Sequence, residues 1–265
     1  MDLGIAGRVA VVTGATRGIG RAVAGALAAE GVALVLGARG AADLEKTTAE
    51  LAETGADVVG VPSDALDPEG AAGVAAAALD RHGRVDVLVN NAGGDSGRLP
   101  FHDLDDEAWE RAYRLNVVSA VRLTRALLPG MRERRWGRIV NVSSYTARVP
   151  EPFCGPYAAA KAALLNLTRT LSRTYAAEGV VTNSVLPGLT RTDGVAAGFA
   201  GAVTATGRTE EDLLAAMLRR APIDVGRPGE ASEVAAAITF LCSEQAAWIS
   251  GTGLLVDGGT VRSVP

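Results

Sequence analysis

The stretch RVAVVTGATRGIG, at Arg8–Gly20, decides the fold. Its first half is an apolar run without polar alternation, which is typical of a parallel strand covered on both faces. Its second half is a GxxxGxG turn followed by a helix predicted to begin at about Ile19. Glycines let a backbone turn sharply and approach a ligand, and a helix N-terminus offers free N–H groups and a positive dipole end. This order of strand, glycine turn and helix predicts a pyrophosphate-binding βα unit.

The alternation of apolar runs and Ala-rich helical segments continues along the chain. Further strands are predicted at 33–38, 57–62, 85–90, 138–143, 180–186 and 253–257. Strand alternating with helix predicts one α/β domain over residues 1–265, a doubly wound, Rossmann-type parallel sheet of about seven strands with helices on both faces. Residues 189–228 interrupt this rhythm with a Gly- and Thr-rich stretch and a further helix. We call them the lid segment, because long insertions beside a sheet edge often cover a site.

Composition narrows the class of function. The 265 residues carry a net charge of −4, which disfavours nucleic acid and anionic membranes as partners. We interpret the basic run at Arg132–Arg138 as a solvated helix end. Two cysteines, Cys154 and Cys242, are too few for a disulfide framework or a Cys-rich metal site, and Cys242 lies in an apolar run predicted to be core. No signal peptide or membrane-spanning run is recognisable, which predicts a cytoplasmic protein without a metal centre.

The end of the second predicted strand indicates the coenzyme. An acidic residue is expected there to hold the 2′-hydroxyl of an adenosine ribose. The sequence instead has Ala38 followed by Arg39. A guanidinium can bind a 2′-phosphate through two hydrogen bonds, and Arg17 in the glycine turn can approach the same group. These residues favour NADP(H) over NAD(H).

Polar residues follow other strands. NNAG at Asn90–Gly93 ends the fourth strand, where open α/β sheets bind ligands, although, taken by itself, the motif is better explained as an ordinary Asx turn. Asn116 lies on a small, apolar stripe of a predicted helix, where its amide either bonds a backbone carbonyl or holds a water. Ser143 and Ser144 end the fifth strand, as turn caps or as polar groups of a reactive site.

The sequence PYAAAK at Pro156–Lys161 places a phenol and an ammonium on one helix face, because residues i and i+4 lie one turn apart. A free tyrosine has a pKa near ~10, too high for easy proton exchange at neutral pH. A neighbouring ammonium favours the phenolate and lowers that pKa. Tyr157 with Lys161 is therefore interpreted as a tuned acid–base pair, and Ser144 as a hydroxyl that polarises a carbonyl beside it. The alternative is an ordinary Tyr–Lys contact at a helix surface.

Together, TGATRGIG, NNAG, LNVVS, NVSS, YAAAK and NSVLPGLTRT resemble, in this order, the motifs of the short-chain dehydrogenase/reductase family. The resemblance covers essentially the whole chain. It implies that Tyr157 donates or accepts the proton, Lys161 lowers its pKa and holds the nicotinamide ribose, Ser144 orients the carbonyl, and Asn116 holds a relay water. It also implies a coenzyme site whose pyrophosphate turn is made by Gly14, Arg17, Gly18, Ile19 and Gly20. In that site the adenine is contacted by Asp64 and Ala65, and the ribose region is lined by Asn91, Ala92 and Gly93. The nicotinamide carboxamide is seated by Pro187, Gly188, Thr190 and Thr192.

The resemblance extends to NADPH-using members such as 3-oxoacyl-carrier-protein reductases and polyketide ketoreductases. It implies a homotetramer built through the helices of Asn116 and Tyr157 and the C-terminal strand. The substrate is then a small carbonyl compound, free or carrier-tethered, bound near Tyr145, Phe153 and Cys154, although the last two can equally be packing residues. Two alternatives remain: oxidation of an alcohol, sugar or steroid, and a nucleotide-binding regulator without turnover, which the intact catalytic set disfavours.

Overall fold

A seven-stranded parallel sheet forms the centre of the computed structural model. The structure describes residues 2–94, 99–220 and 222–262, so the lid segment is described except for residue 221. The strands are β1 (Val9–Thr13), β2 (Ala33–Ala38), β3 (Val58–Pro62), β4 (Val87–Asn90), β5 (Gly137–Val142), β6 (Val180–Pro187) and β9 (Gly253–Val256). The predicted Rossmann-type sheet is confirmed, and every predicted strand is present with ends shifted by at most two residues.

The strand order fixes where a ligand can bind. The order is β3-β2-β1-β4-β5-β6-β9, so the chain winds first to one side of β1 and then to the other. All neighbouring pairs in this sheet are parallel, which brings the carboxyl ends of the strands to one edge. Ligands of open α/β sheets bind outside that edge, at the point where the strand order reverses. Here the reversal lies between β1 and β4, directly beside the glycine turn.

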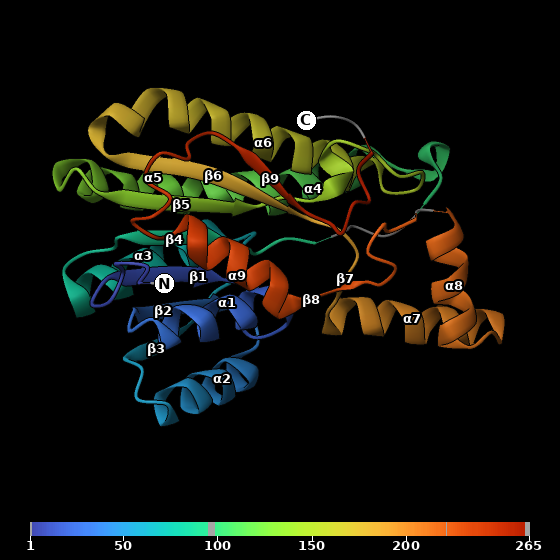
Figure 1. Ribbon diagram of the computed structural model, residues 1–265, viewed down its shortest axis with the longest axis horizontal. Coiled ribbons are helices and arrows are strands. Elements are labelled where there is room, and N and C mark those ends of the chain that lie inside the picture. The colour runs from blue at the N-terminus through green and yellow to red at the C-terminus, as the bar shows by residue number, and fades with distance from the viewer. Residues whose placement is uncertain (1, 95–98, 221, 263–265) are drawn as a thin grey trace.

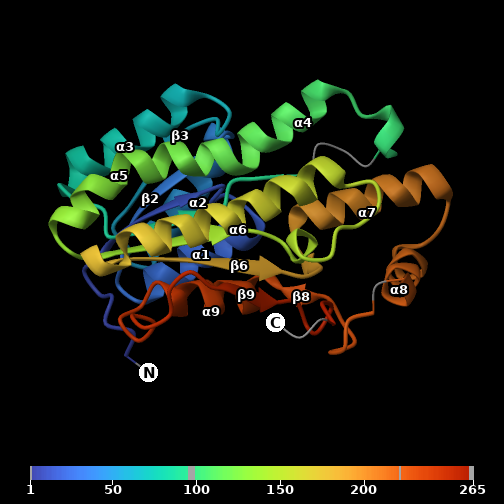
Figure 2. The ribbon, with the colours of Figure 1, turned by 90° about the horizontal axis from the view of Figure 1, so that it is seen from above.

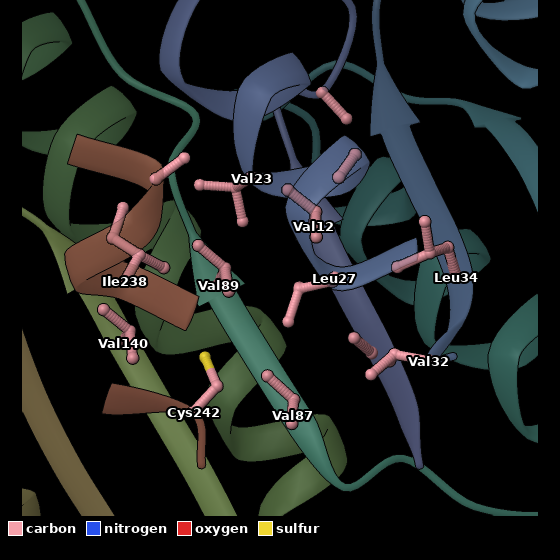
Figure 3. Close-up of a cluster of buried hydrophobic side chains, with 14 of the residues drawn as sticks. Val12, Val23, Leu27, Val32, Leu34, Val87, Val89, Val140, Ile238 and Cys242 are labelled. Carbon is pink, nitrogen blue, oxygen red and sulfur yellow. The ribbon is translucent and has the colours of Figure 1, made fainter. Parts of the chain in front are cut away.

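Helices cover both faces of the sheet (Figures 1 and 2). One face packs α1 (Gly18–Ala29), α2 (Ala41–Glu53) and α9 (Ala231–Leu241), and Figure 3 shows Val23, Leu27 and Ile238 of this layer against Val12 and Val89. The other face carries α3 (Pro68–His82), α5 (Ser119–Glu133) and α6 (Gly155–Tyr175). In β1, Ala10 and Val12 face one layer while Val9 and Val11 face the other. Burial on both faces explains why the strand sequences do not alternate.

The helix predicted around Asn116 is confirmed, and it contains a π-helical turn that the sequence did not indicate. The chain forms a short 3₁₀ turn (Phe101–Asp103), α4 (Asp106–Tyr113), the π-helical turn (Arg114–Val118) and then α5 without a break. Asn116 lies inside the π-helical turn and is buried. Single π-helical turns within α-helices occur frequently at functional sites.

The lid segment is confirmed as an insertion at the carboxyl edge. It contains β7 (Thr190–Arg191), α7 (Asp193–Thr206), α8 (Glu210–Arg220) and β8 (Gly229–Glu230), and β7 pairs with β8 outside the main sheet. Figure 1 shows α7 and α8 projecting beyond the ends of the strands. In α7, all of which the structure describes, no side chain is buried. Two further 3₁₀ turns lie at Tyr145–Ala147 and Ala176–Glu178.

Arg138, at the amino end of β5, corrects the interpretation of the basic run at Arg132–Arg138. Arg138 is only 3% exposed, donates to the Ser243 carbonyl oxygen, and its guanidinium lies 4.5 Å from the centre of the Trp136 ring. The basic run is thus not simply a solvated helix end, because β5 begins at Gly137 and carries Arg138 into the protein. Cys242 is fully buried as predicted, and burial raises the pKa of its thiol to about 12.

Membrane-spanning helices and metal-binding clusters are both absent from the described residues. Over residues 2–94, 99–220 and 222–262, no helix is both long and apolar enough to cross a bilayer. Within the same ranges, no cluster of three His, Cys, Asp or Glu side chains is placed to hold a metal ion.

Candidate active site

A cavity of about 270 Å³ opens at the carboxyl edge of the sheet. It brings Ser144 from the end of β5 together with Tyr157 and Lys161 from the first turns of α6. The predicted coenzyme residues that line the same cavity are Ile19, Asn91, Gly93, Pro187, Gly188, Thr190 and Thr192. Residues separated widely in sequence meet here because β1, β4, β5 and β6 all end at this edge. The three groups expected to handle a carbonyl thus share one cavity with much of the expected coenzyme site.

Lys161 is held rigidly beneath the cavity. Its side chain is buried, its Nζ donates to the Val142 carbonyl oxygen at 2.8 Å, and the same nitrogen lies 5.6 Å from the centre of the Tyr157 ring. Burial lowers the pKa of this ammonium to about 8, because the charged form loses hydration. Lys161 is therefore positioned beside Tyr157 with a pKa below that of a free lysine.

The two serines at the end of β5 have different contacts. The Ser143 hydroxyl donates to the Lys161 carbonyl oxygen at 2.8 Å, which ties α6 to the sheet. The Ser144 Oγ accepts two hydrogen bonds from Thr146, one from its N–H at 3.2 Å and one from its hydroxyl at 2.9 Å. A hydroxyl oxygen has two lone pairs and one hydrogen. With two donors on its oxygen, Ser144 keeps its hydrogen to donate into the cavity that it lines.

Thr146 is a residue that sequence reasoning missed. It is buried and lies in the 3₁₀ turn that follows Ser144, which is the N-cap of that turn. A serine followed two residues later by threonine is compatible with many turns, so the sequence contains only a weak signal.

Asn116 makes contacts with backbone groups. Its Nδ2 donates to the carbonyl oxygens of Ala112, at 2.9 Å, and Gly94, at 3.0 Å, and its Oδ1 accepts from the Gly94 N–H. The backbone alternative for this amide is thus present, while its role toward a relay water stays a prediction. Gly93 makes the arrangement possible, because a Cβ there would lie 2.6 Å from the Asn116 Oδ1 and 3.0 Å from the Lys161 Nζ.

The glycine turn is held by the strand-end asparagine. Asn91 Nδ2 donates to the carbonyl oxygens of Thr13, at 2.8 Å, and Gly14, at 3.1 Å, while Thr13 Oγ1 accepts from the backbone N–H groups of Asn91 and Ala92. A Cβ on Gly20 would lie 2.2 Å from the Gly14 carbonyl oxygen, so no other residue fits there without rearrangement. This close-packed turn at the start of α1 suits a pyrophosphate, which backbone N–H groups bind at a helix N-terminus.

The residues predicted near the adenosine lie at the adjacent strand ends. The Gly14 N–H donates to the Gly37 carbonyl oxygen at 2.7 Å, which brings the glycine turn next to the end of β2. Arg17 and Arg39 are both exposed there, as is Asp64, whose Oδ1 accepts from the Leu66 N–H at 2.9 Å. Ala65 follows as a half-buried residue of the same turn. Neither guanidinium has a hydrogen-bond or ion-pair partner among the described residues, and the strand end carries no acid, which is compatible with a 2′-phosphate.

The residues predicted to contact substrate lie on the loop before α6. Tyr145 donates from its hydroxyl to Glu151 Oε1 at 2.9 Å, and Cys154 Sγ donates to the Glu151 carbonyl oxygen at 3.2 Å. Phe153 is 47% exposed with φ at +70°, and Cys154 is buried. The described lining of the cavity includes none of these three, so their role in substrate binding stays a prediction.

Comparison with known proteins decides the family. A family model described as short chain dehydrogenase matches residues 8–201. This chain belongs to the short-chain dehydrogenase family. A 3-oxoacyl-(acyl-carrier-protein) reductase of Vibrio cholerae is 35% identical over 257 residues, covering 97% of this chain and 98% of that protein. A cis-4-hydroxycyclohexanecarboxylate dehydrogenase of Sinomonas cyclohexanicum is 39% identical over 261 residues, covering 98% of both chains.

A solved short-chain dehydrogenase fold closely matches the structure. L-sorbose reductase of Gluconobacter frateurii, complexed with NADPH and L-sorbose, superimposes with a TM-score of 0.95 at 35% identity and covers 100% of both chains. The relatives thus include both reductases and a dehydrogenase, so membership identifies an oxidoreductase and leaves the direction and the substrate to the site.

Proposed function

We propose that this protein reduces a ketone to a secondary alcohol with NADPH. The observation that carries the proposal is the Ser144 hydroxyl, which lines the cavity shared with Tyr157 and Lys161 and whose oxygen accepts two hydrogen bonds from Thr146, so that its hydrogen is left to donate. A donor is what a substrate carbonyl oxygen needs. The reductases among the relatives, one of them solved with NADPH, support the same activity.

In the proposed mechanism, each residue handles one atom of the carbonyl group. Ser144 donates a hydrogen bond to the carbonyl oxygen and stabilises the negative charge that develops there. Tyr157 then gives the proton of its hydroxyl to that oxygen, and the Lys161 ammonium stabilises the phenolate that remains. When bound, NADPH supplies the hydride that adds to the carbonyl carbon. Asn116 bonds Gly94 through both its amide oxygen and its amide nitrogen, and we assign to it the holding of a proton-relay water.

The preference for NADPH is assigned to the end of β2. The glycine turn and Thr190 and Thr192 would hold the pyrophosphate and nicotinamide parts. Arg39 and Arg17 would bind the 2′-phosphate, since a guanidinium matches phosphate geometry through two hydrogen bonds. The lack of an acid at positions 38 and 39 removes the charge that would repel this phosphate.

The substrate class follows from the surroundings of the cavity. The lid segment is apolar on much of α7, and the Tyr145–Glu151 pair adds polar groups on the facing loop, which suits a ketone with both apolar and hydroxyl-bearing parts. A carrier-tethered chain and a free small ketone both meet this description.

We further propose a cytoplasmic homotetramer, with β9 in an interface. Leu254 on β9 is 37% exposed and Trp248 just before it is 99% exposed, which supports this placement.

The test is NADPH consumption against a panel of ketones, each offered free and as a carrier-tethered thioester where chemistry allows. We expect steady oxidation of NADPH with at least one ketone and much lower activity with NADH. Activity only in the oxidative direction with alcohols would favour the dehydrogenase alternative. Tight NADPH binding without turnover of any ketone or alcohol would favour the nucleotide-binding regulator.

A further inference from the structure

A carboxylate of the lid segment contacts the glycine turn. Asp193 Oδ2 accepts a hydrogen bond from the Gly18 N–H at 3.2 Å, across 175 residues of sequence. Gly18 is the first residue of α1 and Asp193 is the first residue of α7. The carboxylate therefore lies between two helix N-termini, each of which carries partial positive charge and attracts anions.

Other groups already fulfil the structural roles that Asp193 could have. Thr192 caps α7, since its hydroxyl oxygen accepts from the Val195 N–H at 3.3 Å. The arginines that line the groove beside Asp193 are paired elsewhere: Arg21 with Glu50, and Arg191 with Glu230. Asp193 is itself exposed. Its charge is thus not needed to cap its own helix or to neutralise a neighbouring arginine.

The contact lies where the coenzyme phosphates are expected. A pyrophosphate bound at the start of α1 takes its hydrogen bonds from the N–H groups of that first turn. A Cβ on Gly18 would approach the Thr192 side chain to 3.1 Å, so the glycine turn and the start of α7 are in close contact. Two negative charges a few ångströms apart also repel each other.

We propose that Asp193 is an internal competitor of the coenzyme pyrophosphate, which must displace this carboxylate from the Gly18 N–H in order to bind. This inference rests on the proposed use of NADPH at the glycine turn. Because Asp193 is the first residue of α7, its displacement changes the only hydrogen bond between α7 and α1 among the described residues. Coenzyme binding and the position of the lid segment are therefore coupled through this residue.

Calorimetric titration of Asp193→Asn and Asp193→Ala with NADPH tests the proposal. Removing the competing charge should lower the Kd of NADPH about three- to tenfold, the range expected for a lost charge-assisted contact at an exposed helix end. Adenosine 2′-monophosphate has the adenine and the 2′-phosphate but no pyrophosphate, so its Kd should stay unchanged. Asp212→Asn, which removes an exposed acid from α8, should change neither Kd.

Hydrogen–deuterium exchange supplies a second readout. Exchange over residues 193–198 should differ between the wild type and Asp193→Asn without coenzyme and become alike once NADPH is bound. A difference that persists with NADPH contradicts the coupling. If the wild type binds NADPH and the Asp193 variants bind it equally well or more weakly, the competition proposal is overturned while the proposed NADPH-dependent function stands. The same holds if the variants gain as much affinity for adenosine 2′-monophosphate as for NADPH. A wild type that binds neither ligand overturns the proposed NADPH-dependent function as well.

Discussion

The floor of the cavity, by which we mean Ser143, Ser144, Tyr157 and Lys161, and the lid segment are built in opposite ways. In the floor, Ser143, Ser144 and Lys161 are buried and each has a hydrogen bond shorter than 3.3 Å. In the lid segment, α7 buries no side chain, and its recorded link to α1 is the bond between Asp193 and Gly18. Proton transfer requires atoms held within tenths of an ångström, whereas admission of substrate requires a segment that can shift. We therefore propose that the floor carries out the chemistry and that the lid segment selects the ligand.

Tyr157→Phe should have the largest effect. The variant loses one oxygen and keeps the ring, so the floor should pack as before while the proton donor is lost. We expect kcat for ketone reduction to fall on the order of 10²–10⁴-fold. Steady-state kinetics with NADPH, combined with thermal unfolding to show an unchanged fold, checks this. A variant that still reduces ketones at a near-normal rate would show that Tyr157 and Lys161 form only an ordinary contact on a helix face.

A matched pair of leucine truncations compares the stability of the two regions. Leu164 in α6 is 1% exposed, so Leu164→Ala should lower the free energy of unfolding by about 2–5 kcal/mol. Leu213 in α8 is only half-buried, and Leu213→Ala should cost less than about 1 kcal/mol while changing the KM for ketone. Denaturant titration and kinetics of both variants provide the measurement. Equal losses of stability would mean that the lid segment is as firmly packed as the floor.

Arg39→Asp tests the coenzyme end of the site. Replacing a guanidinium by a carboxylate removes two charge-assisted hydrogen bonds and adds repulsion, so kcat/KM for NADPH should fall roughly 10- to 100-fold. The value for NADH should change little. Arg125→Asp, which makes the same charge change at an exposed position on α5, should leave both values near those of the wild type. A wild type that already prefers NADH would show that the assignment to Arg39 is wrong.

Thr146→Val should have the smallest effect on catalysis. Valine keeps the shape of threonine but removes the hydroxyl that donates to Ser144 Oγ at 2.9 Å, so the Ser144 hydrogen is less well directed. We expect kcat to fall about three- to tenfold, the value of one neutral hydrogen bond, with an unchanged Kd for NADPH. The control variant Thr146→Ser keeps the hydroxyl and loses only the methyl group, so its kcat should stay near that of the wild type. Failure of serine to rescue would indicate that the methyl packing of Thr146 matters and not its donor.

The features that could be predicted from the sequence are those set by residues close together along the chain. The Val-rich runs predicted the strands because burial on both faces leaves a local pattern. Tyr157 and Lys161 were predicted to share a face because four residues make about one helical turn, and the strand-end position of Ser144 brought it to the same edge. These three side chains do line one cavity.

Contacts between distant segments were not predictable in the same way. The bonds from Asn91 to the glycine turn span 77 and 78 residues, and the bond between Asp193 and Gly18 spans 175. No local pattern records which strand end meets which turn. The burial of Arg138 was missed for another reason: a strand was predicted from residue 138, yet the whole basic run was assigned to a solvated helix end, whereas α5 ends at Glu133 and β5 begins at Gly137.

The pH dependence of kcat/KM for ketone reduction, in the wild type and in Lys161→Ala, tests the catalytic pair most directly. Reduction needs a protonated phenol, so activity falls as pH rises through the apparent pKa of the pair. Burial lowers the pKa of Lys161 to about 8, so the ammonium that stabilises the phenolate is itself lost as pH rises through that value, and the wild-type decline is expected to begin near it. Without the ammonium, the phenol should keep its proton up to a pH of about 10. Lys161→Arg keeps the charge but not the geometry, and should decline below pH 10 with reduced activity. A decline at the same pH in the wild type and Lys161→Ala would contradict the assignment of Lys161 as the group that tunes Tyr157.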